Sequence, residues 1–344
     1  KALGVVVDGC PAGLSLCEND IQIFLDRRKP GQNAFTTKRN ESDTVQILSG
    51  VFEGKTTGTP ISMLVYNEDQ KSKDYGELAS SYRPGHADFC YDEKYGFRDY
   101  RGGGRSSGRE TIGRVAAGAI AVKLLNELGI ELTTYTRSVG NYMINYDKFD
   151  SAEITKNPLF MPDKECAENA ASYLEELMRS KDSVGSSVEC VVTGLPVGIG
   201  EPVFDKLDAR LAQAVMSIGA VKAVEIGDGT EAATTIGSIN NDSFHIKDNM
   251  IVKSTNHSGG TLGGMSDGSD LIVRASFKPT PSIYQEQLTV NSSKEEISLA
   301  IKGRHDPIIG PRAVVVVEAM TALTILDLMM INVSSKLDNL KKIY

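Results

Sequence analysis

Cysteine and histidine are scarce in this chain of 344 residues, and tryptophan is absent. The 5 cysteines are odd in number and form no CxxC pair, which argues against a disulfide framework and against a zinc site. They indicate reduced thiols in a cytosolic setting. A basic excess is also missing, because 37 Lys and Arg face 45 Asp and Glu, for a formal net charge of -8. Nucleic-acid-binding proteins usually carry a basic face, so small anionic ligands fit this chain better.

Long uninterrupted apolar runs are missing as well. The longest apolar stretch, 313–333, is broken by Glu318 and Asp327, so we expect a buried helix there and no membrane span. No signal peptide is recognisable. The sequence opens at Lys1 and enters the strand-like run ALGVVVDG at its second residue, so we expect a further segment upstream. A hydrophobic content of 40% with 24% charged residues is typical of a folded globular protein, and it argues against disorder.

Two segments resemble one another. VVVDGCPAGL, residues 5–14, and CVVTGLPVGI, residues 190–199, each contain a β-branched run that closes on Gly-x-Pro-x-Gly. Each is followed by a helical pattern, which predicts a strand, a turn and an amphipathic helix used twice. An internal duplication within one α+β unit is the simplest account, and chance similarity is the alternative. No linker-like stretch divides the chain, so we predict a single domain over residues 1–344.

Arginines gather in an otherwise acidic chain at DYRGGGRSSGRE, residues 99–110. Arg101, Arg105 and Arg109 surround three consecutive glycines and precede a strong helical pattern. Glycine backbone, serine hydroxyls and a helix N-terminus together make an anion cradle. A flexible loop before a well-capped helix would look the same. However, arginine opposes the dipole at this end of a helix, and a bound anion would relieve that conflict.

The sequence also predicts where the helix after this segment begins and ends. Ser107 and Glu110 form an S-x-x-E capping box, in which the serine accepts from a backbone N–H and the glutamate reaches back. Gly129 supplies a helix-terminating position after the pattern TIGRVAAGAIAVKLLNEL.

Two of the 4 histidines lie between an arginine and a carboxylate, beside proline or glycine. These sets are RPGHAD, with Arg83, His86 and Asp88, and GRHDP, with Arg304, His305 and Asp306. Such surroundings suit an acid or base tuned near neutral pH, whereas a structural histidine and a turn-capping aspartate are the alternatives.

Two glycine-rich segments do not match nucleotide-binding motifs. GVFEGKTTG, residues 50–58, has the wrong glycine spacing for a P-loop and is followed by a turn. NHSGGTLGG lacks the G-x-G-x-x-G spacing of a dinucleotide fingerprint, although its backbone could still approach a ligand.

Several long motifs closely resemble those of chorismate synthases and occur in the family's order along nearly the whole chain. The longest is RPGHADFCYDEKYGFRDYRGGGRSSGRETIGRVAAGAIA, residues 83–121. The others are DRRKPG at 26–31, the segment 200–229, NHSGGTLGGMSDG at 256–268, KPTPS at 278–282 and GRHDPIIGPRAVVVVEAM at 303–320.

This resemblance implies a 1,4-anti elimination of phosphate from 5-enolpyruvylshikimate 3-phosphate to give chorismate, the last common step toward the aromatic amino acids. Family members require reduced FMN although the reaction has no net redox change. The resemblance further implies an α+β fold, a β-α-β sandwich with an internal duplication, in a cytoplasmic homotetramer. Fungal members that reduce their own flavin with NADPH are longer, so we expect the kind that receives reduced FMN from an external flavin reductase. No nucleic-acid or membrane partner is expected.

Site residues follow from the matching motifs. The resemblance implies that substrate anions bind to Arg28, Arg83, Arg109 and Arg304. It implies flavin contacts at Arg105, Ser106, Ser107, Gly219, Ala220, Gly263, Lys278, Pro279, Thr280, Pro281, Ser282 and Arg304, and no metal site. His86 would lie near the flavin and help settle the charge of its reduced ring, and Asp306 would act with flavin N5 to remove the C6 proton of the substrate.

The sequence departs from the family's pattern at three places. A Gly-Glu-Ser-His-Gly turn, whose histidine is thought to protonate the leaving phosphate, normally stands just before the position of Ala2. Ala34 stands where the family has a second arginine, six residues beyond Arg28, which weakens one anion contact and any nicotinamide contact there. Gly219 stands where asparagine is frequent, so only its backbone can touch the flavin. A binding protein that has lost catalysis and an ordinary flavin oxidoreductase remain the competing functions.

Overall fold

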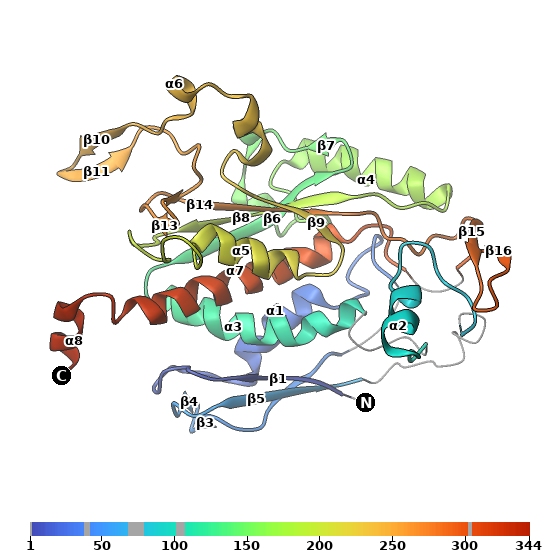
Figure 1. Ribbon diagram of the computed structural model, residues 1–344, viewed down its shortest axis with the longest axis horizontal. Coiled ribbons are helices and arrows are strands. Elements are labelled where there is room, and N and C mark those ends of the chain that lie inside the picture. Colours follow the sequence, from blue (N-terminus) through green and yellow to red (C-terminus); the bar gives the residue numbers. More distant parts are fainter. Residues whose placement is uncertain (1, 38–41, 68–78, 101–106, 302–304) are drawn as a thin grey trace.

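The computed structural model describes residues 2–37, 42–67, 79–100, 107–301 and 305–344. Four helices form a central layer between two antiparallel sheets (Figure 1). These helices are α1 (Glu18–Arg28), α3 (Thr111–Glu127), α5 (Leu207–Met216) and α7 (Gly310–Asn332). The mixed α+β prediction is therefore confirmed.

The smaller sheet has the strand order β1-β5-β2, and the larger one has the order β7-β6-β8-β14-β9. Their bounds are β1 (Ala2–Val7), β5 (Ile61–Tyr66), β2 (Val45–Ile47), β7 (Tyr142–Met143), β6 (Glu131–Val139), β8 (Ser186–Thr193), β14 (Leu271–Phe277) and β9 (Val221–Ile226). Burial alternates along β14, as expected where one face of a strand packs on helices. The central strand β8 is buried on both faces through most of its length, as expected for a strand inside a sheet that is covered on both sides.

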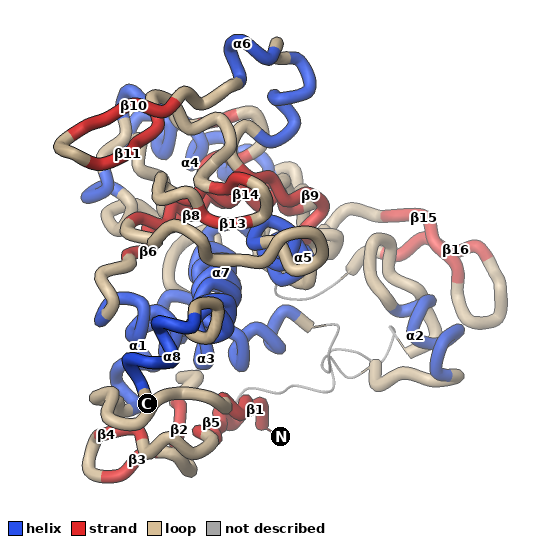
Figure 2. Tube along the Cα trace, turned by 60° about the vertical axis from the view of Figure 1, so that its left-hand side comes forward, coloured by secondary structure: helices blue, strands red, loops and turns tan. Residues whose placement is uncertain are grey.

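Smaller elements surround this sandwich. They are β3 (Val51–Phe52), β4 (Lys55–Thr56), α2 (Asp88–Tyr95), α4 (Lys164–Arg179), α6 (Gly237–Asn240), β10 (Phe244–Lys247), β11 (Met250–Lys253), β12 (Thr261–Leu262), β13 (Met265–Ser266), β15 (Gln287–Val290), β16 (Glu296–Leu299) and α8 (Leu337–Ile343). Short 3-10 turns lie at Gly108–Glu110, Tyr146–Lys148, Ser151–Glu153 and Gly229–Thr234. The hairpin of β10 and β11 projects from the body in both Figure 1 and Figure 2.

The two apolar helices α3 and α7 form the centre of the core. Helix α7 is long and apolar enough to cross a membrane by length and composition alone, yet most of its apolar stretch is buried inside the structure. The predicted buried helix is thus confirmed. The helices cross at Gly118 of α3, where an added Cβ would collide with the Cβ of Ala319. A glycine here permits the close approach of two backbones.

Both strand–turn–helix units predicted from the sequence are present, as β1 with α1 and β8 with α5. Their turns also share backbone conformations. Gly9 and Gly194 have φ of 77° and 78°, and Gly13 and Gly198 have φ of 97° and 94°. All four glycines adopt the left-handed region that other residues disfavour.

Each of these turns is held by a hydroxyl from a short hairpin. Thr56 of β4 accepts from the N–H of Leu14 at 3.0 Å, and Ser266 of β13 accepts from the N–H of Ile199 at 2.8 Å. Each hydroxyl also donates to the carbonyl of the proline three residues before its backbone partner. The segment 50–58 is therefore a hairpin, β3–β4, and not a P-loop, as expected from its spacing.

Candidate functional site

Most of the described site residues lie near the end of the helical layer that faces α2, on the right of Figure 1. The C-terminal end of α1 meets the N-terminal ends of α3 and α7 there. Arg28, the last residue of α1, donates from Nη2 to the carbonyl of Gly108 at 3.0 Å and from Nε to the hydroxyl of Thr111 at 2.7 Å. Arg312, in the first turn of α7, donates from Nε to the Arg28 carbonyl at 3.0 Å.

Two of the expected substrate-binding arginines meet at one carboxylate. Arg28 Nη1 lies 3.2 Å from Asp43 Oδ2, and Arg109 Nη2 lies 2.8 Å from Asp43 Oδ1. The Asp43 carboxylate is fully buried, and the Arg28 side chain is 4% exposed. The conflict between arginine and the α3 dipole is therefore already reduced by protein carboxylates, since Glu110 also pairs with Arg114 at 2.9 Å.

Asp306 belongs to the same group of side chains. Its Oδ1 accepts from the backbone N–H of Thr37 at 2.7 Å, and its Oδ2 pairs with Arg312 Nη1 at 2.6 Å. Because Arg312 also binds the Arg28 carbonyl, the carboxylate and the paired arginines share one chain of contacts. We call Arg28, Asp43, Arg109, Asp306 and Arg312 the arginine–carboxylate cluster.

A second group of residues surrounds His86. Its Nε2 lies 2.6 Å from the hydroxyl of Ser282, and Lys278 Nζ donates to the Gly85 carbonyl at 2.6 Å. An added Cβ on Gly85 would lie 2.7 Å from Pro281, so the RPGHAD loop packs directly against KPTPS. The structure thus brings together two motifs that lie almost 200 residues apart.

The surroundings of His86 favour its neutral form. Burial is the largest cause and lowers its pKa to about 4, and the nearby Arg83 cation adds to this effect. Asp88 acts in the opposite direction but does not outweigh them. His305 also lowers the pKa of His86, which shows that the segment carrying Asp306 lies near this second group.

Arg83 is already engaged by a neighbouring carboxylate. Its Nε and Nη2 donate to the two oxygens of Asp88 at 2.7 and 2.8 Å, and its backbone N–H donates to the same group at 3.1 Å. These hydrogen bonds hold the pKa of Asp88 below its usual value, against the raising effect of its burial. A substrate anion would therefore meet an arginine whose fork is shared with Asp88.

The structure brings together some of the residues that are expected to contact the flavin, although they lie in separate motifs. The backbone N–H of Lys278 donates to the Ala220 carbonyl at 3.0 Å, and Ala220 has a φ of 75°. An added Cβ on Gly219 would meet no atom within 4 Å, so its backbone is open. The KPTPS segment is fixed further by the Thr280 carbonyl, which accepts from the Ser183 hydroxyl at 2.7 Å.

Gly263 lies apart from these residues within the chain. It occupies the β12–β13 turn, and the next residue, Gly264, accepts from the N–H of Leu207 at the start of α5. Gly219 follows the other end of α5, and a ten-residue helix is about 15 Å long.

The cap of α3 is only partly as expected. Ser107 accepts from the N–H of Arg109 at 3.2 Å, which confirms its capping role. Glu110 pairs with Arg114 and makes no reciprocal capping bond among the described residues, because the first turn is a 3-10 helix. The helix stop at Gly129 is confirmed by a φ of 75°. The expected contacts at Arg105, Ser106 and Arg304 lie outside the described residues.

Three residues of this site were missed by sequence reasoning. Asp43 belongs to none of the motifs, Arg312 lies within the segment 303–320 without an expected role, and Thr37 contributes a backbone N–H that no side-chain pattern reveals. Arg312 had one available signal, since it follows Asp306 by six residues and precedes a helix.

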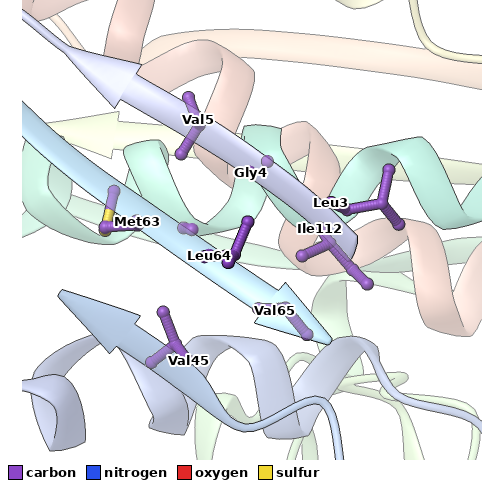
Figure 3. Close-up of a pocket in the computed structure, with 10 residues that line it drawn as sticks. Leu3, Gly4, Val5, Val45, Met63, Leu64, Val65 and Ile112 are labelled. Atoms are coloured by element: carbon purple, nitrogen blue, oxygen red, sulfur yellow. The ribbon is translucent and has the colours of Figure 1, made fainter. Parts of the chain in front are cut away.

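Figure 3 shows a pocket elsewhere in the molecule, between the smaller sheet and the start of α3. Its lining is apolar, with Leu3, Val45, Met63 and Ile112 among the labelled residues. It contains no titratable side chain and so offers no chemistry.

Comparison with known proteins agrees with the motifs. The family model described as chorismate synthase matches residues 1–330. A chorismate synthase from Agathobacter rectalis is 67% identical over 344 residues, which is all of this chain and 94% of the relative. The chain belongs to the chorismate synthase family. It is therefore a phosphate-eliminating lyase of the shikimate pathway.

Two further comparisons support this assignment. A chorismate synthase from Lachnospira eligens is 63% identical over 344 residues, again all of this chain and 94% of the relative. A crystal structure of a chorismate synthase matches with a TM-score of 0.76 at 29% identity, covering 99% of this chain and 95% of the other. The fold is therefore that of this family.

Proposed function

We propose that this chain converts 5-enolpyruvylshikimate 3-phosphate to chorismate by a 1,4-anti elimination of phosphate, with reduced FMN bound beside the substrate. The observation that carries this proposal is the connection between Arg28, Arg109 and Asp306 through Asp43 and Arg312. An anion-binding group and a carboxylate able to accept a proton are held in one rigid unit. An elimination that removes a proton and an anionic leaving group needs both.

The described residues fit a flavin phosphate and ring. Lys278 is a half-buried cation, Ser282 supplies a hydroxyl beside His86, and the open backbone at Gly219 adjoins Ala220 and Lys278. Cationic and hydroxyl donors with an accessible backbone suit an anionic planar ligand. When bound, reduced FMN supplies transient electron donation that assists departure of phosphate.

We assign flavin contact to the family's matching positions. These are Arg105, Ser106, Ser107, Gly219, Ala220, Gly263, Lys278, Pro279, Thr280, Pro281, Ser282 and Arg304. Gly263 lies at the far end of α5 from Gly219 within one chain, so its contact would come from a second copy in the assembly.

We assign the substrate phosphate and carboxylates to Arg28, Arg83, Arg109 and Arg304. Charge-assisted hydrogen bonds from arginine contribute about 1.5–3 kcal/mol each, which favours arginine for a substrate with three anionic groups. Among the described candidates we favour Arg109, because its side chain is 14% exposed, against 4% for Arg28, whereas Arg83 donates two hydrogen bonds to Asp88.

Asp306 accepts the C6 proton of the substrate. The Thr37 N–H and Arg312 each hold one carboxylate oxygen, which orients the group. His86 is neutral before ligands bind and accepts or donates a hydrogen bond near the flavin. An anionic ring placed beside it would favour its protonated form.

Further parts of the proposal concern assembly and supply. We propose an internally duplicated chain in a cytoplasmic homotetramer that receives reduced FMN from an external flavin reductase and has no NADPH-dependent activity of its own. Repeated hydrogen bonds at Thr56 and Ser266 support the duplication. Support for association comes from the projecting β10–β11 hairpin, where Phe244, Ile246 and Ile251 are more than 60% exposed.

The decisive experiment is anaerobic. Full-length protein is mixed with 5-enolpyruvylshikimate 3-phosphate and chemically reduced FMN, and phosphate release and chorismate absorbance are followed together. Equal amounts of both products without flavin oxidation are expected. Asp306→Asn should lower kcat by at least about 100-fold, within the range of lost acid–base catalysis, while flavin and substrate affinities stay within threefold.

Other outcomes would identify the competing functions. Ligand binding without phosphate release would indicate a binding protein, and stoichiometric NADPH consumption would indicate an oxidoreductase. Unchanged turnover in Asp306→Asn would remove that residue from the mechanism.

A further inference from the structure

Asp43 is a carboxylate buried inside the proposed substrate site, and neither proton transfer nor flavin binding requires it. It is 1% exposed and lies between the guanidinium groups of Arg28 and Arg109. We propose that Asp43 is a positioning residue for substrate binding, which fixes both arginines in the arrangement that receives the substrate's anions. This inference rests on the proposed function and extends it.

Within the described residues, the Asp43 carboxylate contacts these two guanidinium groups. Each carboxylate oxygen faces a different arginine, at 3.2 Å for Arg28 and 2.8 Å for Arg109. Arg28 comes from α1, and Arg109 precedes α3. One carboxylate therefore ties together two helix ends at the point where the ligand is expected.

The other contacts of Arg28 determine which of its nitrogens faces Asp43. Its Nε and Nη2 are bound to Thr111 and Gly108, so Nη1 is the nitrogen that faces Asp43. The Arg28 backbone in turn holds Arg312, which holds Asp306. A shift at Asp43 would thus move the anion-binding guanidinium groups, whereas Asp306 keeps its own contacts to the Thr37 N–H and Arg312.

The backbone at Asp43 is also built for this placement. Its φ of 47° lies in the left-handed region, where aspartate, asparagine and glycine are tolerated better than other residues. Asparagine keeps the side-chain shape and suits this backbone, so Asp43→Asn removes the charge with little added strain.

Two physical roles for Asp43 predict opposite effects. A carboxylate that only neutralises the arginines repels substrate anions, so its removal would tighten substrate binding. A carboxylate that positions them preorganises the site, so its removal would weaken binding because a misplaced arginine forms poorer hydrogen bonds. The sign of the change in KM separates the two.

The test compares Asp43→Asn with Glu318→Gln in the anaerobic assay. Glu318 is a matched control, since it is 5% exposed and pairs in two-pronged fashion with Arg27, the neighbour of Arg28. We expect Asp43→Asn to raise the KM for 5-enolpyruvylshikimate 3-phosphate at least tenfold, with kcat within threefold and FMN affinity within twofold. Glu318→Gln should lower the melting temperature and leave KM within twofold.

An unchanged or lower KM in Asp43→Asn would overturn the positioning role, and so would an equal rise of KM in Glu318→Gln. Should Asp43→Asn yield no folded protein, Asp43→Gly is measured against the same criteria. Failure of both variants to fold would make Asp43 a folding residue and end the proposal. An inactive wild type would instead count against the proposed function.

Discussion

At the scale of single residues, His86 packs against the KPTPS segment and has a pKa well below its ordinary value. Its loop packs against Ser282 and Lys278, as the family's motifs imply for a residue near the flavin. Burial and the Arg83 cation nevertheless favour the neutral imidazole, with a pKa of about 4. An anion placed beside this neutral histidine would favour its protonated form.

This charge state predicts a pH dependence of stability. In the unfolded chain His86 takes up a proton near its ordinary pKa of about 6.5, whereas in the folded protein it does so only near 4. Its contribution is thus complete above pH 6.5 and is lost as the pH falls toward 4. We expect the free energy of unfolding to fall by about 1 kcal/mol less in His86→Gln than in the wild type between pH 7 and pH 5, allowing for partial exposure.

Denaturant titrations of the ligand-free protein at the two pH values measure this difference. His245→Gln is a suitable control, because this histidine lies on the exposed β10 strand. Identical pH profiles for His86→Gln and the wild type would contradict the neutral assignment.

Local patterns predicted one part of the site and missed the other for a physical reason. Arg83, His86 and Asp88 are close in sequence, so their contacts follow from a single loop. Asp43 pairs with Arg28, 15 residues before it, and Arg312 links Asp306 to a backbone carbonyl 284 residues away. Such contacts depend on how α1, α3 and α7 pack, which residue type and spacing alone do not reveal.

At the scale of elements, α3 shows how far local signals extend. Ser107 and Gly129 mark its two ends as expected, because capping uses atoms within a few residues. The function of Gly118 was not predicted, because its reason lies on another helix. Its hydrogen atom occupies the space where α3 and α7 cross.

The same helix offers a matched pair of variants. Gly118→Ala adds a methyl group that collides with Ala319, so we expect a loss of about 2 kcal/mol or more in the free energy of unfolding. Gly113→Ala should instead stabilise by up to about 1 kcal/mol through helix propensity, since the nearest atom to its added Cβ, the Gly4 carbonyl, lies at 3.4 Å. Chemical denaturation at one fixed protein concentration measures both. A Gly118→Ala protein as stable as Gly113→Ala would show that the crossing adjusts freely.

At the scale of the whole molecule, the sequence predicted a repeat from only ten residues in each copy. The two turns also share one kind of contact that the sequences of their hairpins do not reveal. The hairpins β3–β4 and β12–β13 have the sequences VFEGKT and TLGGMS, which have little in common. Neither sequence predicts that its hydroxyl reaches a turn. Their shared feature is one buried hydroxyl that bonds a turn, and a threonine can be replaced by a serine there without changing the bond.

The hydroxyls of Thr56 and Ser266 should contribute about equally to the free energy of unfolding. Thr56→Val and Ser266→Ala each leave a backbone N–H and a proline carbonyl without their hydroxyl partner in a buried turn. An unsatisfied buried polar group costs about 1–3 kcal/mol, so each variant should lose about 2 kcal/mol in the free energy of unfolding. Thr57→Val is the control, because its hydroxyl is exposed and, among the described residues, bonds to the Thr59 hydroxyl alone. Denaturant titrations at one protein concentration measure all three. A loss of stability in only one of Thr56→Val and Ser266→Ala would mean that the two turns contribute differently to stability despite their common geometry.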